Sequence, residues 1–104
     1  YLPLHVGADL HPDVLTDWVQ DNTGDNISAR NATYSELTGL YWLWKNCSSD
    51  YVGIVHYRRL LGTANWVRRH TTRDRIDRVV GGDELLALLR DSDIILPRRR
   101  NYFI

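Results

Sequence analysis

The sequence predicts an α/β fold with a mostly parallel sheet and flanking helices. Two apolar runs, "YVGIV" at residues 51–55 and "DIILP" at residues 93–97, have the length and branched side chains of buried strands. A helical pattern precedes each run, at residues 34–46 and 83–90. Because alternation of helices and strands is typical of parallel sheets, this order favours the α/β class.

The chain begins with an extended run and two loops. Pro3 lacks an N–H donor, so "YLPLHV" is predicted as an edge strand or an extended lead-in. Residues 7–15 are predicted to form a loop, since Gly7 and Pro12 interrupt any regular pattern. "DNTGDNIS" at residues 21–28 predicts a dense turn in which Gly24 is free to adopt positive φ.

The predicted helix at residues 34–46 has start and stop signals. Thr33 and Glu36 have the spacing of a capping box, and Lys45 falls in the last turn, where a cation suits the helix dipole. Apolar residues recur at helical spacing and predict a buried stripe of Leu37, Leu40, Tyr41 and Trp44.

The second half of the chain is predicted to form a loop, a helix and a strand. Residues 62–80 are polar and basic without a clean period, which predicts a long loop. "DELLALLR" at residues 83–90 predicts a short helix with acids at its start and Arg90 at its end. Pro97 stops the strand that follows, and "RRRNYFI" closes the sequence.

The composition is typical of part of a single globular domain. The 104 residues are 43% hydrophobic and 25% charged. No apolar run approaches the ~18 residues that a membrane-spanning helix needs. The single Cys47 excludes an internal disulfide framework and a four-cysteine metal site, and it fits a reducing compartment.

Charge is balanced overall but unevenly distributed. Net charge is zero, with −5 in residues 1–50 and +5 in residues 51–104. The basic half can offer a positive face to an anionic ligand, or its arginines can pair with the acidic half.

Arginines follow both predicted core strands. His56, Tyr57, Arg58 and Arg59 come directly after the first strand, and Arg98, Arg99 and Arg100 follow the second. Ligands of open α/β sheets bind beyond the carboxyl ends of the strands, so parallel neighbouring strands would bring both groups to one crevice. Guanidinium groups bind phosphate in a fixed fork, which predicts a phosphorylated ligand with Arg98 and Arg99 as further phosphate contacts.

Four segments carry a resemblance to a known family. They are "HVGADL", "DNTGDNISARNATYSELTGLYWLWKN", "DYVGIVHYRRLL" and "DIILPRRRNYFI". Together they resemble the capsular and exopolysaccharide glycosyltransferase family catalogued as domain of unknown function 4422. The resemblance implies a GT-A-like (Rossmann-like) fold and transfer of a sugar from a nucleotide-sugar donor to a growing glycan. It also implies that residues 1–104 are the N-terminal part of a larger domain, incomplete and inactive alone.

One departure from ordinary GT-A transferases bears on metal use. Those enzymes carry an Asp-x-Asp motif after a strand, whose hard oxygen ligands bind Mg²⁺ or Mn²⁺ beside the donor pyrophosphate. Here "HYRR" stands where that motif is expected and offers no carboxylate. The resemblance therefore implies that arginines take the role of the metal, with no cofactor required and no metal ligands assigned.

The resemblance implies two groups of donor-binding residues, each with a structural alternative. Asp25 and Asn26 contact the ribose or sugar hydroxyls, or they only form the turn. Arg30 and Asn31 lie beside the nucleotide-sugar, or they are solvated loop residues.

The second group follows the predicted strand. His56 contacts a phosphate or sugar, or it is a hydrogen-bonded core histidine. Tyr57 also contacts a phosphate or sugar, or it packs on the sheet. In an extended chain Arg58 shares a face with His56 and Arg59 with Tyr57, so we expect Arg58 to be the main pyrophosphate contact. The catalytic residue is not identifiable.

The expected partners are a nucleotide-sugar donor and a glycan or lipid-linked glycan acceptor, at a cytoplasmic location that includes the inner membrane face. Two other classes stay open: a nucleic-acid-binding module that uses the basic half, and a noncatalytic interaction domain. Nucleic acid is the less favoured partner, because most aromatic residues lie in the helix stripe and not beside the arginines.

Overall fold

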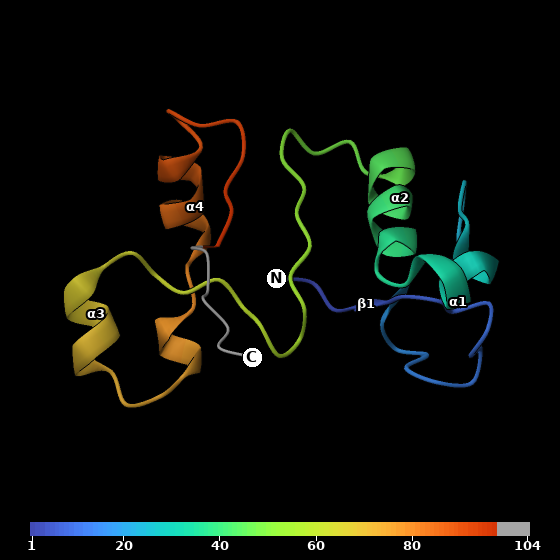
Figure 1. The fold of residues 1–104 in the computed structure, drawn as a ribbon, viewed down its shortest axis with the longest axis horizontal. Helices are drawn as coiled ribbons and strands as arrows, with labels where there is room; N and C mark the ends of the chain where they lie inside the picture. Colours follow the sequence, from blue (N-terminus) through green and yellow to red (C-terminus); the bar gives the residue numbers. More distant parts are fainter. Residues whose placement is uncertain (98–104) are drawn as a thin grey trace, which may run out of the picture. The chain divides into compact units, whose positions relative to one another are not determined.

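The computed structural model describes residues 1–97, and the chain divides into two compact units, Tyr1–Ile54 and Val55–Ile104. We call them unit 1 and unit 2. Figure 1 shows their helices and strands, coloured along the sequence.

Unit 1 contains a small parallel sheet. β1 (Leu4–His5) pairs with β2 (Val19–Gln20), with Leu4 opposite Val19 and His5 opposite Gln20. β1 lies within the segment "YLPLHV" that is predicted to be extended. A two-residue strand such as β2 is too short to give an alternating pattern. The parallel pairing and the flanking helices confirm an α/β class.

Three helical elements follow the sheet in unit 1. They are the 3₁₀ turn η1 (Ser28–Arg30), α1 (Asn31–Tyr34) and α2 (Leu37–Asn46). The turn before them is as predicted, and Gly24 has a φ of +58°. Lys45 lies in the last turn of α2, also as predicted.

The predicted capping box is wrong. Thr33 lies inside α1, and no side chain caps the start of α2, whose N-cap residue is Glu36. Ser35 has a φ of +47°, which is incompatible with a continuous right-handed helix, so the helix is interrupted there. The side-chain amide of Asn31 donates to the carbonyl oxygen of Ser35 at 2.8 Å and supports the break.

The predicted buried stripe of α2 is also wrong. The buried residues of α2 are Thr38 and Gly39, and the side chains of the stripe are half-buried or exposed: Leu37, Leu40, Tyr41 and Trp44. A Cβ built on Gly39 would lie 3.0 Å from side-chain carbons of both Leu4 and Val6. The helix thus contacts the β1 segment through its smallest residue, because glycine permits the closest approach.

The described part of unit 2 contains short helices and an isolated antiparallel bridge between Gly62 and Val79. α3 (Trp66–Thr71) and the 3₁₀ turn η2 (Ile76–Arg78) interrupt residues 62–80, so the prediction of a plain loop is wrong there. The side chain of Asn65 accepts from the backbone N–H of Arg68 at 3.0 Å and caps α3. α4 (Gly82–Leu88) confirms the last predicted helix, with acids in its first turn. The helix ends at Leu88, so the prediction that Arg90 lies at its end is wrong.

The two predicted core strands are absent from the described residues. Residues 51–55 and 93–97 have no strand hydrogen bonding and are mostly exposed, with Ile94 at 73% and Leu96 at 78%. Branched residues favour a strand only where a neighbouring strand can pair with them. Within residues 1–97, these two segments therefore lack a strand to pair with.

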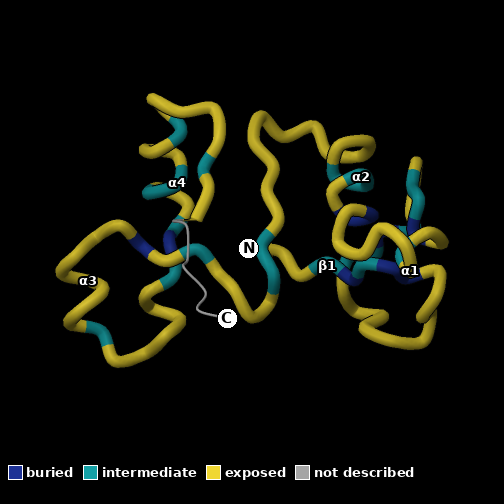
Figure 2. Tube along the Cα trace, viewed as in Figure 1, coloured by how far each residue is buried: buried dark blue, intermediate teal, exposed yellow. Residues whose placement is uncertain are grey.

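The buried interior is small and largely polar. Ala8 and Val80 are the buried hydrophobic residues of the described part, alongside five buried polar ones: His5, Asp21, Ser28, Thr38 and Thr63. Figure 2 shows how much of the chain is exposed, including all of α3. Most of the buried side chains in the described residues therefore need hydrogen-bond partners.

Candidate functional site

The predicted loop of residues 21–28 is anchored by a buried carboxylate. Asp21 Oδ1 accepts from the backbone N–H of Gly7 and of Ala8, at 3.0 and 3.1 Å, and from the Ser28 hydroxyl at 2.6 Å. Asp21 Oδ2 accepts from the Gly7 N–H at 2.9 Å and from the Thr38 hydroxyl at 2.7 Å. This single side chain joins the turn after β1, the predicted loop and α2, and we call the group the Asp21 cluster.

The Asp21 cluster favours an ionised carboxylate. Burial by itself would raise the pKa of Asp21, because it removes water from the charged form. Hydrogen bonds from Ser28, Gly7, Thr38 and Ala8 outweigh that effect and lower the pKa below its ordinary value. The charge is thus held in place by donors, and Asp21, which the sequence marks only as a turn residue, is the anchor of the loop.

Asp25 and Arg30 are the two charged residues predicted in this loop region. The backbone of Asp25 is fixed by the Asn46 side chain, which accepts from its N–H at 3.2 Å and donates to its carbonyl at 2.8 Å. The Tyr41 hydroxyl donates to Asp25 Oδ1 at 3.0 Å. Both Asp25 and Arg30 are exposed and therefore accessible to a ligand.

Asn26 and Asn31 have clear structural roles. Asn26 Nδ2 donates to the Gly24 carbonyl at 3.0 Å, and Asn26 Oδ1 accepts from the Ser28 N–H at 3.1 Å. Asn31 supports the helix break at Ser35. The amide of Asn26 maintains a local turn, which is its structural alternative, whereas Asn31 lies in α1 and is not a solvated loop residue.

In unit 2, residues 56–59 form a tight turn. The Arg59 N–H donates to the His56 carbonyl at 2.7 Å, and the two residues form an antiparallel bridge. The expectation that the strand geometry continues through Arg59 is wrong, so alternation does not set the faces of the two arginines.

The side chains of this turn stack on one another. The rings of His56 and Tyr57 lie 4.4 Å apart, and the Arg58 guanidinium lies 5.1 Å from the Tyr57 ring centre. The Arg58 N–H donates to His56 Nδ1 at 3.2 Å, so the hydrogen of the neutral imidazole belongs on Nε2. Tyr57 is 75% exposed. The turn therefore presents two guanidinium groups and an aromatic ring to solvent.

The predicted candidates fall into separate groups. Asp25, Asn26, Arg30 and Asn31 belong to unit 1, and residues 56–59 belong to unit 2. Arg98 and Arg99 lie outside the described residues. The argument that two parallel strands bring arginines to one sheet edge does not hold, because residues 51–55 and 93–97 are not strands.

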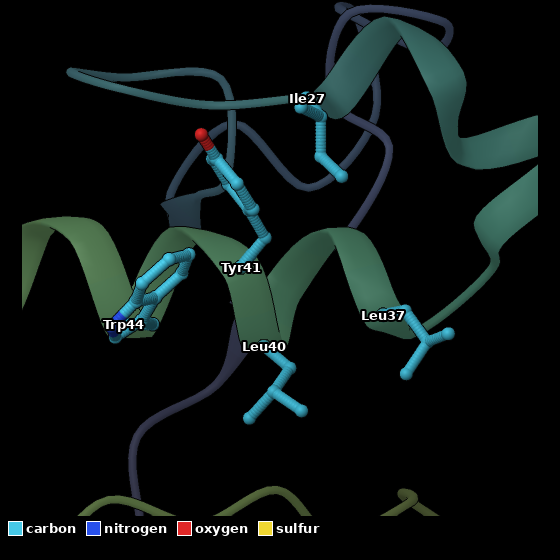
Figure 3. A pocket seen from close by; sticks show the side chains of 5 residues that line it. All are labelled: Ile27, Leu37, Leu40, Tyr41 and Trp44. Atoms are coloured by element: carbon cyan, nitrogen blue, oxygen red, sulfur yellow. The ribbon is translucent and has the colours of Figure 1, made fainter.

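Unit 1 also has an apolar hollow of about 370 Å³ that sequence reasoning missed (Figure 3). Its lining residues are Ile27, Leu37, Leu40, Tyr41 and Trp44. Tyr41 extends from α2 on the side of the helix where Ile27 lies (Figure 3), and its ring meets that of Trp44 edge-on, with ring centres 5.7 Å apart. The sequence signal for this hollow is the helical spacing of its apolar residues. The same spacing predicts a buried face, and for that reason it did not indicate an open hollow.

Neither a metal cluster nor a membrane span is found in the described residues. In residues 1–97, no three histidine, cysteine or acidic side chains lie together in a way that could hold a metal ion. No helix in this part of the chain has the length and apolar character needed to cross a membrane.

Comparisons with known proteins place the sequence in one family. The family model described as Domain of unknown function (DUF4422) matches residues 1–104. No curated protein and no solved structure matches the chain.

Proposed function

Because the chain belongs to the DUF4422 family over residues 1–104, we propose that it is part of a glycosyltransferase that builds a surface polysaccharide. The reaction transfers a sugar from a nucleotide-sugar donor to a growing glycan. The sequence resemblance to capsular and exopolysaccharide transferases supports this proposal, and a GT-A-like architecture is part of it.

The observation that carries the proposal is the exposed basic turn at residues 56–59. Its two arginines are exposed, and neither forms an ion pair with a residue of the described chain. A guanidinium offers several N–H donors in a plane that matches two phosphate oxygens. The turn therefore has the chemistry needed to bind a pyrophosphate.

In the proposed reaction the basic turn stabilises the leaving group. As the bond between the sugar and the nucleoside diphosphate breaks, negative charge grows on the phosphate oxygens. Fixed cations beside those oxygens lower the energy of the transition state. Arg58 suits this role because Tyr57 supports its guanidinium from one side. The proposal assigns this task to arginines and requires no divalent cation.

The sequence resemblance also implies donor-binding residues in a loop of unit 1, and this loop presents charged groups of its own. Asp25 and Arg30 are exposed, and the Asp21 cluster fixes the loop that carries them. A carboxylate can accept hydrogen bonds from ribose or sugar hydroxyls. Asn26 would contribute by shaping this loop, since its amide is engaged within it, and Asn31 by supporting the helix break at Ser35.

The experiment is a thermal-shift and calorimetric screen of the whole protein against nucleotide sugars, with and without Mn²⁺. We expect binding of at least one nucleotide sugar in the absence of metal. For that ligand, Arg58→Ala should weaken binding about tenfold, or ~1.4 kcal/mol, because solvent screens a contact in an exposed turn. Arg58→Lys should restore only part of the affinity, since an ammonium cannot form the fork.

Arg90→Ala is the matched control, because Arg90 is another exposed arginine of unit 2. It should leave the affinity unchanged. If Arg58→Ala and Arg59→Ala both bind the nucleotide sugar as the unmodified protein does, the basic turn is not the pyrophosphate site. If no nucleotide sugar binds at all, the noncatalytic interaction domain becomes the better description.

A further inference from the structure

Unit 2 contains a second basic feature, separate from the turn at residues 56–59. A hollow of about 360 Å³ is lined by Gly62, Arg69, His70 and Arg78. Its volume is in the range of small-ligand sites, roughly 300–1,000 Å³. Three of its four lining residues carry cationic or ionisable side chains, and none is acidic. We call this hollow the α3–η2 pocket.

The backbone holds the two sides of the α3–η2 pocket together. Gly62 and Val79 form an antiparallel bridge, and the Thr63 N–H donates to the Arg78 carbonyl at 2.8 Å. A Cβ built on Gly62 would lie 3.7 Å from that same carbonyl oxygen. Gly62 therefore runs close beside Arg78.

Arg78 is fixed on one side and keeps donors for a ligand. Its Nε and Nη2 donate to the Thr72 carbonyl at 3.0 and 2.7 Å. These two bonds orient the guanidinium plane but use only part of its N–H donors. A preoriented guanidinium loses less conformational entropy when it binds an anion.

His70 is likewise oriented by a hydrogen bond to a backbone carbonyl. Its Nδ1 lies 2.8 Å from the Trp66 carbonyl, which can only accept, so Nδ1 carries the hydrogen. The His70 ring also stacks on the Trp66 ring, with centroids 4.7 Å apart. These contacts fix the imidazole on the exposed surface of α3.

Two carboxylates of unit 2, those of Glu84 and Asp74, accept hydrogen bonds from groups outside the pocket lining. Glu84 accepts from the Thr63 hydroxyl and the Ala64 N–H, both at 2.6 Å. Asp74 Oδ1 accepts from the Ile76 N–H at 2.9 Å. Arg69 has no hydrogen bond or ion pair from its side chain to the described residues. Its charge is thus available to an anion from outside the chain.

From this geometry we propose that the α3–η2 pocket binds a phosphate group, with Arg69 and Arg78 as its guanidinium contacts and His70 at its side. The chemistry is that of a phosphate or diphosphate anion, either in a dissolved molecule or in a lipid headgroup. The proposal does not rest on glycosyl transfer, because it uses none of the residues assigned to the donor.

The test measures binding of three probes to the whole protein: inorganic pyrophosphate, vesicles of phosphatidylcholine with phosphatidic acid, and vesicles of phosphatidylcholine alone. We expect Arg69→Gln to weaken binding of an anionic probe about 5- to 10-fold, since it removes one screened charge-assisted contact. Arg78→Gln should weaken it as well. Arg73→Gln is the control, because Arg73 is an exposed arginine in the same segment that does not line the pocket.

The probes distinguish the two sources of the phosphate. Loss of pyrophosphate binding in Arg69→Gln, with no binding to either vesicle, indicates a dissolved ligand. Loss of binding to the anionic vesicles, with competition by pyrophosphate, indicates a lipid headgroup.

Two results would overturn the proposal. The first is unchanged binding of every anionic probe in both Arg69→Gln and Arg78→Gln. The second is an equal loss in Arg73→Gln, which would indicate diffuse attraction to the basic surface. Circular dichroism of each variant checks that the fold is retained. Because the Arg69 side chain makes no hydrogen bond within the described chain, Arg69→Gln remains informative even if Arg78→Gln loosens the pocket.

Discussion

Replacement of Asp21 by asparagine should destabilise the turn region of unit 1, so that it unfolds more easily. The asparagine side chain could keep one acceptor oxygen at the position of Oδ1, facing Gly7, Ala8 and Ser28. Its amide nitrogen would replace Oδ2, which accepts from Thr38 at 2.7 Å and from Gly7 at 2.9 Å. The change removes both charge-assisted bonds to Oδ2, of which the bond from Thr38 is the shorter, and weakens those to Oδ1.

The expected cost follows from those contacts. A hydrogen bond to a charged group contributes about 1.5–3 kcal/mol, and a buried donor that loses its partner adds to the cost. We expect Asp21→Asn to destabilise unit 1 by about 3 kcal/mol. This corresponds to roughly 100-fold faster exchange of amide hydrogens that open with the cluster.

Hydrogen exchange of the whole protein measures this effect locally. The backbone N–H groups of Gly7 and Ala8 donate directly to Asp21, so they are the reporters. Asp17→Asn is the control, because Asp17 is an exposed acid of the same unit. If Asp21→Asn leaves exchange at Gly7 and Ala8 within a factor of about two of the unmodified protein, the carboxylate does not hold this turn.

The same cluster predicts a pH dependence. The pKa of Asp21 is lowered in the folded protein relative to its ordinary value of 3.8. The folded state therefore favours the ionised form, and its extra stability is fully present above the pKa of the unfolded chain. That stability falls as pH drops through the lower folded pKa. The difference between the unmodified protein and Asp21→Asn should thus be large at neutral pH and smaller in acid below the ordinary pKa. A difference that grows on acidification would refute the sign of this argument.

Two further changes test the turn and the helix break. Gly24→Ala should destabilise unit 1 by about 1–2 kcal/mol, because φ is +58° and the new Cβ would collide with the Asn46 side chain; Gly53→Ala, with open space around it, should not do so in the same urea titration. Thr33→Ala should change the free energy of unfolding by less than about 0.5 kcal/mol, since Thr33 is an exposed residue inside α1, and a loss near ~1 kcal/mol would instead support the capping box.

Local signals in the sequence determined several features correctly. Gly24 in a run of turn residues predicts positive φ, which the structure confirms. "YLPLHV", interrupted by Pro3, predicts an edge strand or an extended lead-in, and β1 forms at Leu4–His5 within it. Acids at residues 83 and 84 predict the start of α4. These features depend on a few neighbouring residues, whose steric and dipole preferences act without distant partners.

Apolar patterns were less reliable, because burial depends on what the rest of the chain brings nearby. Leu37, Leu40 and Trp44 have helical spacing, and they do lie on a helix, but they line an open hollow (Figure 3). Residues 51–55 have strand-forming side chains and no strand partner in the described chain. A pattern reports the preference of a segment, whereas pairing and packing require a second segment.

For the candidate sites, the sequence by itself determined which residues carry charge, and the tertiary structure decided what each charge does. The order "HYRR" identified a basic group after an apolar run, but only the bridge between His56 and Arg59 shows that these residues form a tight turn. Asp21 resembled any other turn acid in the sequence. Its donors lie between 7 and 17 residues away along the chain, at Gly7, Ala8, Ser28 and Thr38. Those groups converge on one carboxylate only after the chain folds, because burial leaves each of them no water to bond with instead.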